Sequence, residues 1–66
     1  TMSRESRLWD LIEGYNIATY DELCLVTDIN GYSVETLNDV IYARTGYRDW
    51  NQMAEAEGIE EMFDED

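Results

Sequence analysis

The stretch IYARTGYRDWNQM, residues 41–53, decides how this chain is organised. It holds two of the chain's four basic residues, Arg44 and Arg48, among tyrosine and tryptophan side chains, a mixture also found on nucleic-acid-binding surfaces. The same residues fit a junction between two helices, because Gly46 suits a left-handed helix end and Asp49 suits an N-cap. We therefore interpret the stretch mainly as a helix end, a turn and a helix start.

The residues before this junction predict a helix that follows Ser33 and ends near Thr45. The preceding letters NGY indicate a turn, and serine is a preferred N-cap residue. Apolar residues then recur at helical spacing, which gives the helix one core-facing side. That side comprises Val34, Leu37, Val40 and Ile41, with Arg44 on the same side near the end of the helix.

The residues after the junction predict a shorter helix that begins at Trp50 and stops at Gly58. Asp49 and Gln52 have the spacing of a capping box, in which each side chain bonds to the other's backbone. Met53 follows Trp50 at helical spacing, so both are expected to face the core.

The first half of the chain predicts two more helices. One spans Ser3–Gly14, with Ser3 or Ser6 as N-cap and Gly14 as C-cap. The other spans residues 20–28, because Thr19 lies three residues before Glu22 in another capping box. The letters LCLVT, residues 23–27, also fit a short strand, but the specific cap favours a helix.

The predicted fold class is therefore all-α: a small bundle of three core helices and a fourth short one, within a single domain of residues 3–58. The second and third helices, joined by a short turn with Gly31, have the spacing of a helix-turn-helix unit. The expected core comprises Leu8, Trp9, Ile12, Leu23, Val26, Leu37, Val40, Ile41, Trp50 and Met53.

The C-terminal letters predict an acidic, mobile tail over residues 59–66. Residues 55–66 hold seven acids and no base, and they follow a glycine stop. We expect the chain from Glu60 onward to be dispensable for folding. The alternative is that Ile59, Met62 and Phe63 dock as a final turn.

Composition excludes several functions. Histidine and lysine are absent and there is one cysteine, so neither a common zinc site nor the usual acid–base and nucleophilic sets can be assembled. We expect no enzyme activity and no cofactor. A single free thiol is typical of a reducing compartment, and no apolar run approaches the ~20 residues of a membrane span, so we expect a cytoplasmic protein without a membrane partner.

The net charge of −12 argues against direct nucleic-acid binding. DNA affinity depends largely on neutralising phosphates, and the would-be recognition helix carries Glu35 and Asp39 with Arg44 as its only base. A second hypothesis uses the negative charge itself. Ordered carboxylates can imitate a row of phosphates and occupy a basic cleft. The candidate acidic mimic face comprises Glu13, Asp21, Glu22, Asp28, Glu35 and Asp39.

Five tyrosines are many for so small a core, and tyrosine is a favoured anchor in protein interfaces. The leading functional hypothesis is therefore a non-catalytic module that binds another protein, with a basic protein among the options, or a second copy of itself. The candidate interaction surface comprises Tyr32, Tyr42, Arg44, Tyr47 and Arg48.

The stretch TYDELCLVTDINGYSVETLNDVIYARTGYRDWNQM, residues 19–53, resembles short, acidic, uncharacterised proteins of Firmicutes conjugative elements and prophages. The resemblance covers the middle half of the chain and includes no catalytic motif. It implies a small accessory protein of a bacterial cytoplasm, with an anti-restriction or other inhibitor role among the options. It assigns no role to any single residue.

Overall fold

The computed structural model describes residues 3–63, and these fold into four helices without a strand. The helices are α1 (Arg4–Gly14), α2 (Tyr20–Asn30), α3 (Val34–Thr45) and α4 (Trp50–Glu57). The predicted all-α bundle is thus confirmed, and the third and fourth helices have the predicted bounds. None of the described helices has the length and apolar character needed to cross a bilayer.

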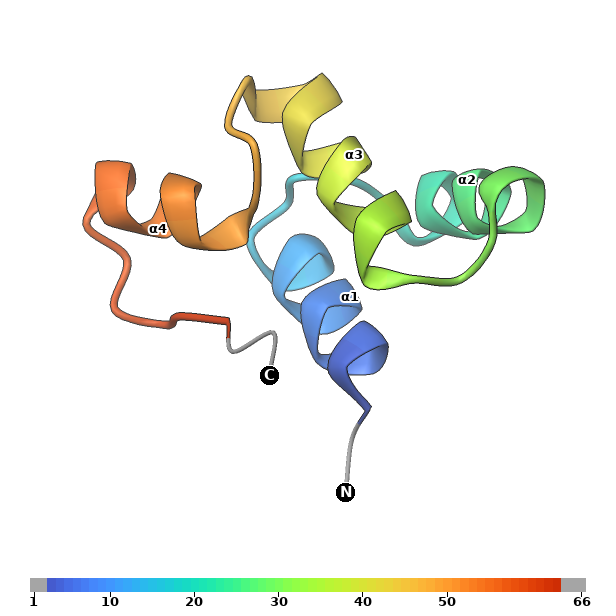
Figure 1. Cartoon of the computed structure of the whole chain (residues 1–66), viewed down its shortest axis with the longest axis horizontal. Coiled ribbons are helices and arrows are strands. Elements are labelled where there is room, and N and C mark those ends of the chain that lie inside the picture. Colours follow the sequence, from blue (N-terminus) through green and yellow to red (C-terminus); the bar gives the residue numbers. More distant parts are fainter. Residues whose placement is uncertain (1–2, 64–66) are drawn as a thin grey trace.

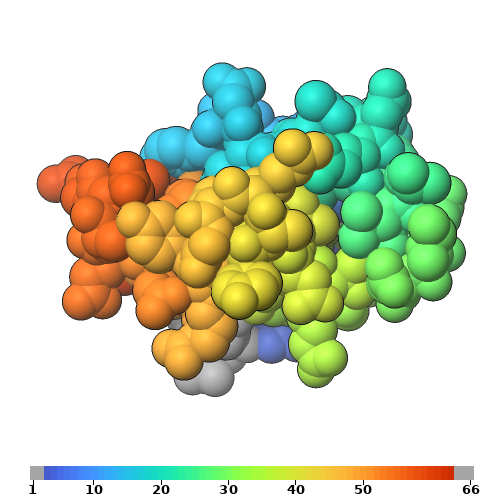
Figure 2. Space-filling model, turned by 90° about the horizontal axis from the view of Figure 1, so that it is seen from above, coloured from blue at the N-terminus to red at the C-terminus, as the bar shows by residue number. Residues whose placement is uncertain are grey.

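Helix α3 is the centre of the bundle. It packs against α1, α2 and α4, and Figure 1 shows α2 and α4 on opposite sides of it. The view in Figure 2 agrees: α3 crosses the middle of that face, with α2 at one end and α4 at the other. The two ends of the molecule therefore present different surfaces, one formed by α2 and one by α4 with the chain that follows it.

Each helix begins at the side chain that the sequence predicts. The N-caps Ser3, Thr19, Ser33 and Asp49 all accept a hydrogen bond from a backbone N–H three residues later. The distances are 3.1 Å for Ser3, 3.2 Å for Thr19 and Ser33, and 2.8 Å for Asp49. Between the two possible caps of the first helix, Ser3 is the one used.

Two helix ends differ from the predictions. Helix α1 ends at Gly14 with Tyr15 as its C-cap, and the left-handed residue is Asn16, at φ 58°. The prediction of Gly14 as C-cap is therefore wrong. Asn16 takes the left-handed position instead, since asparagine tolerates this conformation as glycine does. Helix α2 continues to Asn30, two residues beyond the predicted end, and the strand alternative for residues 23–27 is wrong.

Gly46 ends α3 in the left-handed conformation, at φ 83° and ψ −6°, and its N–H bonds to the carbonyl of Tyr42 at 2.9 Å. A methyl group here would meet no neighbouring atom, so the cost of Gly46→Ala comes from the backbone alone. We expect this substitution to lower the free energy of unfolding by about 1 kcal/mol. Urea unfolding measures it, and an unchanged midpoint would contradict the assigned helix end.

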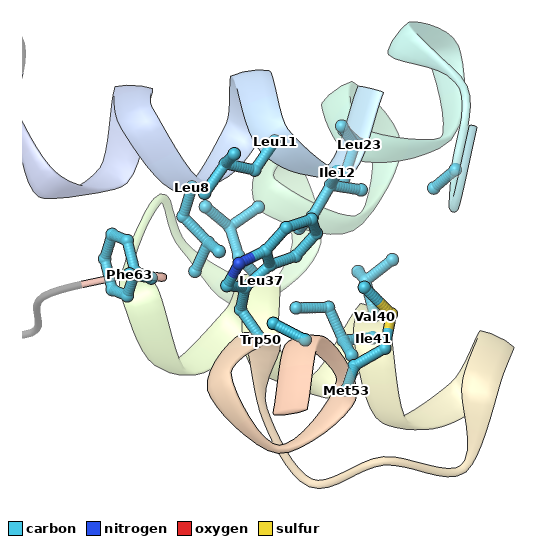
Figure 3. Close-up of a cluster of buried hydrophobic side chains, with 12 residues drawn as sticks. Leu8, Leu11, Ile12, Leu23, Leu37, Val40, Ile41, Trp50, Met53 and Phe63 are labelled. Carbon is cyan, nitrogen blue, oxygen red and sulfur yellow. The ribbon is translucent and has the colours of Figure 1, made fainter. Parts of the chain in front are cut away.

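The buried core contains most of the predicted residues. It comprises Leu8, Leu11, Ile12, Ala18, Leu23, Leu37, Val40, Ile41, Trp50, Met53, Ala54 and Phe63, and Figure 3 labels ten of them. Trp9 and Val26 were predicted to be buried, but they lie at the edge of this cluster, partly exposed. Leu11, Ala18 and Ala54 are core residues beyond the prediction, and burial of Phe63 was predicted only as the alternative to a mobile tail.

The C-terminal segment, residues 59–63, packs on the bundle instead of leaving it. Phe63 is 2% exposed, and its backbone N–H and carbonyl both bond to the side-chain amide of Asn51 at 2.6 Å. The indole N–H of Trp50 donates to the carbonyl of Glu61 at 2.7 Å. The segment therefore belongs to the packed body, which corrects the tail predicted from residue 59. The last three residues of that tail lie outside the described residues.

Candidate interaction surface

Three of the five predicted surface residues form side-chain hydrogen bonds within the molecule. The first is Tyr32, whose ring meets that of Trp9 edge to face at 5.9 Å and whose hydroxyl lies 2.9 Å from the Ser6 hydroxyl. Its side chain therefore joins the α2–α3 turn to α1. Because 52% of Tyr32 is still exposed, it can also contribute to a contact surface.

The second is Arg44, which joins α3 to α2. Its guanidinium forms a two-point ion pair with the carboxylate of Glu22, and the Nε–Oε2 distance is 2.8 Å. The hydrogen bond to this carboxylate, together with its charge, raises the pKa of Arg44. Arg44 therefore has its carboxylate partner inside the molecule, which leaves it less suited to recognising a phosphate.

The third is Tyr47, which is partly buried and donates from its hydroxyl to Glu57 at 3.0 Å. Tyr42 and Arg48 are exposed, and Arg48 stands 4.0 Å from Asp49. Tyr32 precedes α3 and Tyr47 follows it, so a helix of 12 residues, about 18 Å long, separates them. The five predicted residues do not gather at one place.

The predicted acidic face is also divided. Glu13 accepts a hydrogen bond from the indole N–H of Trp9 at 3.0 Å and is partly buried, while Glu22 is held by Arg44. The other four carboxylates are exposed, two on α2 and two on α3. These are Asp21, Asp28, Glu35 and Asp39.

A surface that the sequence reasoning missed lies on the outer side of α2. Leu25 is 60% exposed and Ile29 is 72% exposed, and they lie four residues apart on one side of the helix. The sequence already indicated that Leu25 faces outward. Leu23 faces the core, and two further residues turn the helix by about 200°, which points Leu25 away from it.

Large exposed apolar side chains are concentrated on the α2–α3 helix pair. Seven such residues are exposed within the described chain, and five of them lie between residues 20 and 42. These five are Tyr20, Leu25, Ile29, Tyr32 and Tyr42, and the other two are Tyr15 and Met62. The exposed side of the α2–α3 pair therefore replaces the five predicted residues as the best candidate for a contact surface.

Away from the α2–α3 pair, two tyrosine hydroxyls donate hydrogen bonds to carboxylates of the C-terminal half. Tyr15 donates to Glu61 at 2.9 Å, and its ring meets that of Trp50 edge to face at 5.0 Å. The hydrogen bond to the carboxylate, then desolvation and the negative charge, raise the pKa of Tyr15 above 10.0. Tyr47 has a raised pKa for the same main reason, its bond to Glu57.

These raised pKa values predict a loss of stability at alkaline pH. The folded state binds the phenolic protons more tightly than the unfolded chain, so this contribution is complete below pH 10.0 and is lost as the pH rises through the folded pKa values. We expect a Tyr15→Phe/Tyr47→Phe variant to lose less stability than the wild type between neutral pH and about 11. Urea unfolding at several pH values tests this. If the free energy of unfolding falls equally with pH in the variant and in the wild type, the prediction is contradicted.

The described residues were also searched for a metal site. Among residues 3–63, no three side chains of His, Cys, Asp or Glu are arranged to hold a metal ion. Comparisons with protein-family models, with curated proteins and with solved structures give no match. The functional argument therefore rests on the surface of the molecule itself.

Proposed function

We propose that this protein is a non-catalytic module that binds another protein through its α2–α3 helix pair. The observation that carries this proposal is the concentration of exposed Tyr, Leu and Ile side chains between residues 20 and 42. Some exposure of apolar groups is unavoidable in a small domain. Small size alone would spread the exposed apolar side chains evenly over the surface. A contact surface concentrates them in one place, as they are on the α2–α3 pair.

A second candidate function uses the charge of the same helices. Asp21, Asp28, Glu35 and Asp39 are exposed on α2 and α3, as a nucleic-acid mimic that inhibits a basic DNA-binding protein requires. Salt separates the two proposals. A complex held by exposed charges weakens steeply as salt screens them, while a complex anchored by apolar side chains does not. A role as an accessory protein of a bacterial mobile element, in the cytoplasm, is compatible with both.

The test is photo-crosslinking of the full chain in the cell from which it comes. The photoreactive amino acid p-benzoylphenylalanine replaces Leu25, Tyr42 or, as a control at the far end of the molecule, the exposed Glu55 on α4. We expect a covalent adduct with one other protein from position 25 or 42 and none from position 55. The absence of adducts at both 25 and 42 contradicts the proposed function.

The same surface predicts that the protein does not bind duplex DNA. In a helix-turn-helix arrangement α3 would enter the major groove, but its exposed Glu35 and Asp39 would face phosphates there. Arg44, which would be the helix's only base, is bonded to Glu22. We expect no binding in anisotropy titrations of labelled duplex at physiological salt. Sub-micromolar binding that weakens with salt would contradict this.

A further inference from the structure

We infer that the outer side of α2 binds a basic amphipathic helix of a partner protein. This inference rests on the proposed function and assigns it a surface and a partner chemistry. The surface is defined by Asp21, Leu25, Asp28 and Ile29 and is called the outer α2 face below. All four side chains are exposed.

The outer α2 face has the form of a helix-packing ridge. Asp21, Leu25 and Ile29 follow one another at intervals of four residues, and rows of this spacing are the ridges that fit into the grooves of a second helix. Asp28, three residues after Leu25, lies beside the row. No other described segment covers Leu25 and Ile29, which are 60% and 72% exposed. Figures 1 and 2 place α2 at one end of the molecule, where a partner helix has access.

The charges beside the ridge determine the chemistry of the partner. Asp21 stands at the beginning of the row and Asp28 lies on one flank of it, and both are exposed carboxylates without a base next to them in sequence. On the other flank, Glu22 is neutralised by its two-point bond to Arg44. A partner helix that fits this pattern has an apolar stripe for Leu25 and Ile29 and Lys or Arg side chains along one edge of that stripe.

A second copy of this chain does not have that pattern. Each copy carries a net charge of −12, so two outer α2 faces would bring their carboxylates together. The helix with two arginines one turn apart is α1, with Arg4 and Arg7, but its leucines Leu8 and Leu11 are buried. The occupant is therefore a different protein.

The experiment measures binding of two labelled synthetic peptides of about 18 residues, or five helical turns, by fluorescence anisotropy. One peptide carries leucines at helical spacing with lysines along one edge, and in the other the leucines are replaced by serines. The tested variants are Leu25→Ser/Ile29→Ser and Asp21→Asn/Asp28→Asn. The matched controls are Met62→Ser, for exposed apolar area away from the α2–α3 pair, and Glu55→Gln/Glu60→Gln, for charge. Because all these side chains are exposed, circular dichroism spectra and melting temperatures should be unchanged.

We expect the wild type to bind the leucine–lysine peptide and to bind the serine–lysine peptide at least ~10-fold more weakly. Leu25→Ser/Ile29→Ser should weaken binding of the leucine–lysine peptide by a similar factor. Asp21→Asn/Asp28→Asn should weaken it several-fold and reduce its salt dependence. The two control variants should bind as the wild type does.

Four results overturn the inference. Equal affinity for both peptides means that charge alone is recognised. Equal losses in the control variants mean that the outer α2 face is not the site. A dimer in sedimentation experiments that Leu25→Ser/Ile29→Ser dissociates means that a second copy occupies the face. An in-cell adduct from position 42 but not from position 25 would leave the proposed function standing and reject only this placement.

Discussion

Replacement of Phe63 by alanine is expected to lower the free energy of unfolding by about 3–5 kcal/mol, the usual loss when a buried phenylalanine is truncated. Phe63 is 2% exposed and lies in the same cluster as Leu8 and Trp50 (Figure 3). A core of this size rarely supplies more than about 3–5 kcal/mol in total. The variant should therefore be largely unfolded at room temperature, as measured by circular dichroism and urea titration.

A neighbouring residue provides the control. Met62 is 45% exposed and its side chain lies outside the core, so Met62→Ala should change the urea midpoint little. A chain that ends at Glu60 should lose as much stability as Phe63→Ala, because it lacks both Phe63 and the two bonds to Asn51. If this shortened chain unfolds like the wild type, the C-terminal segment does not pack as described, and the tail predicted from the sequence is restored.

The helices could be predicted because their signals are local. A cap residue bonds within one turn, as Ser33 and Asp49 do, and a glycine such as Gly46 ends a helix through its own backbone. The docking of the C-terminal segment has no such signal. It depends on contacts of Phe63 with Asn51, 12 residues away, and with the core. In the acidic stretch EEMFDED, the apolar letters indicated docking only as an alternative to a mobile tail.

The candidate surface could be predicted only in part, for a different reason. Residue type correctly indicated that some tyrosines would be exposed, and Tyr42 is. It could not show that Arg44 is bonded to Glu22, because that contact depends on how α2 crosses α3. Leu25 and Ile29 were missed because the surface was predicted from tyrosine and arginine residues alone, although the expected burial of Leu23 already placed them on the outer side of α2.

Trp50 is the second residue whose replacement should have a large effect. It is 0% exposed, the first residue of α4, and its ring meets that of Tyr15. We expect Trp50→Ala to lower the free energy of unfolding by about 3–5 kcal/mol, whereas exposed Arg48→Ala should be nearly silent. In a Trp9→Phe background, the emission maximum of Trp50 should lie at a shorter wavelength than that of free tryptophan in water. Emission like that of free tryptophan would place Trp50 on the surface and contradict the helix junction.

The effects of Trp50 and Phe63 should also depend on each other. The indole N–H of Trp50 holds the carbonyl of Glu61, two residues before Phe63, so it helps to place the phenylalanine in the core. Trp50→Phe keeps an aromatic ring there but removes this donor, at a cost of about 1 kcal/mol. In the Trp50→Phe background, Phe63→Ala should therefore cost less than it does in the wild type, and a double-mutant cycle measures the difference. Additivity within about 0.5 kcal/mol would mean that the Trp50–Glu61 bond does not position Phe63, and that the packing of its ring alone holds the C-terminal segment in place.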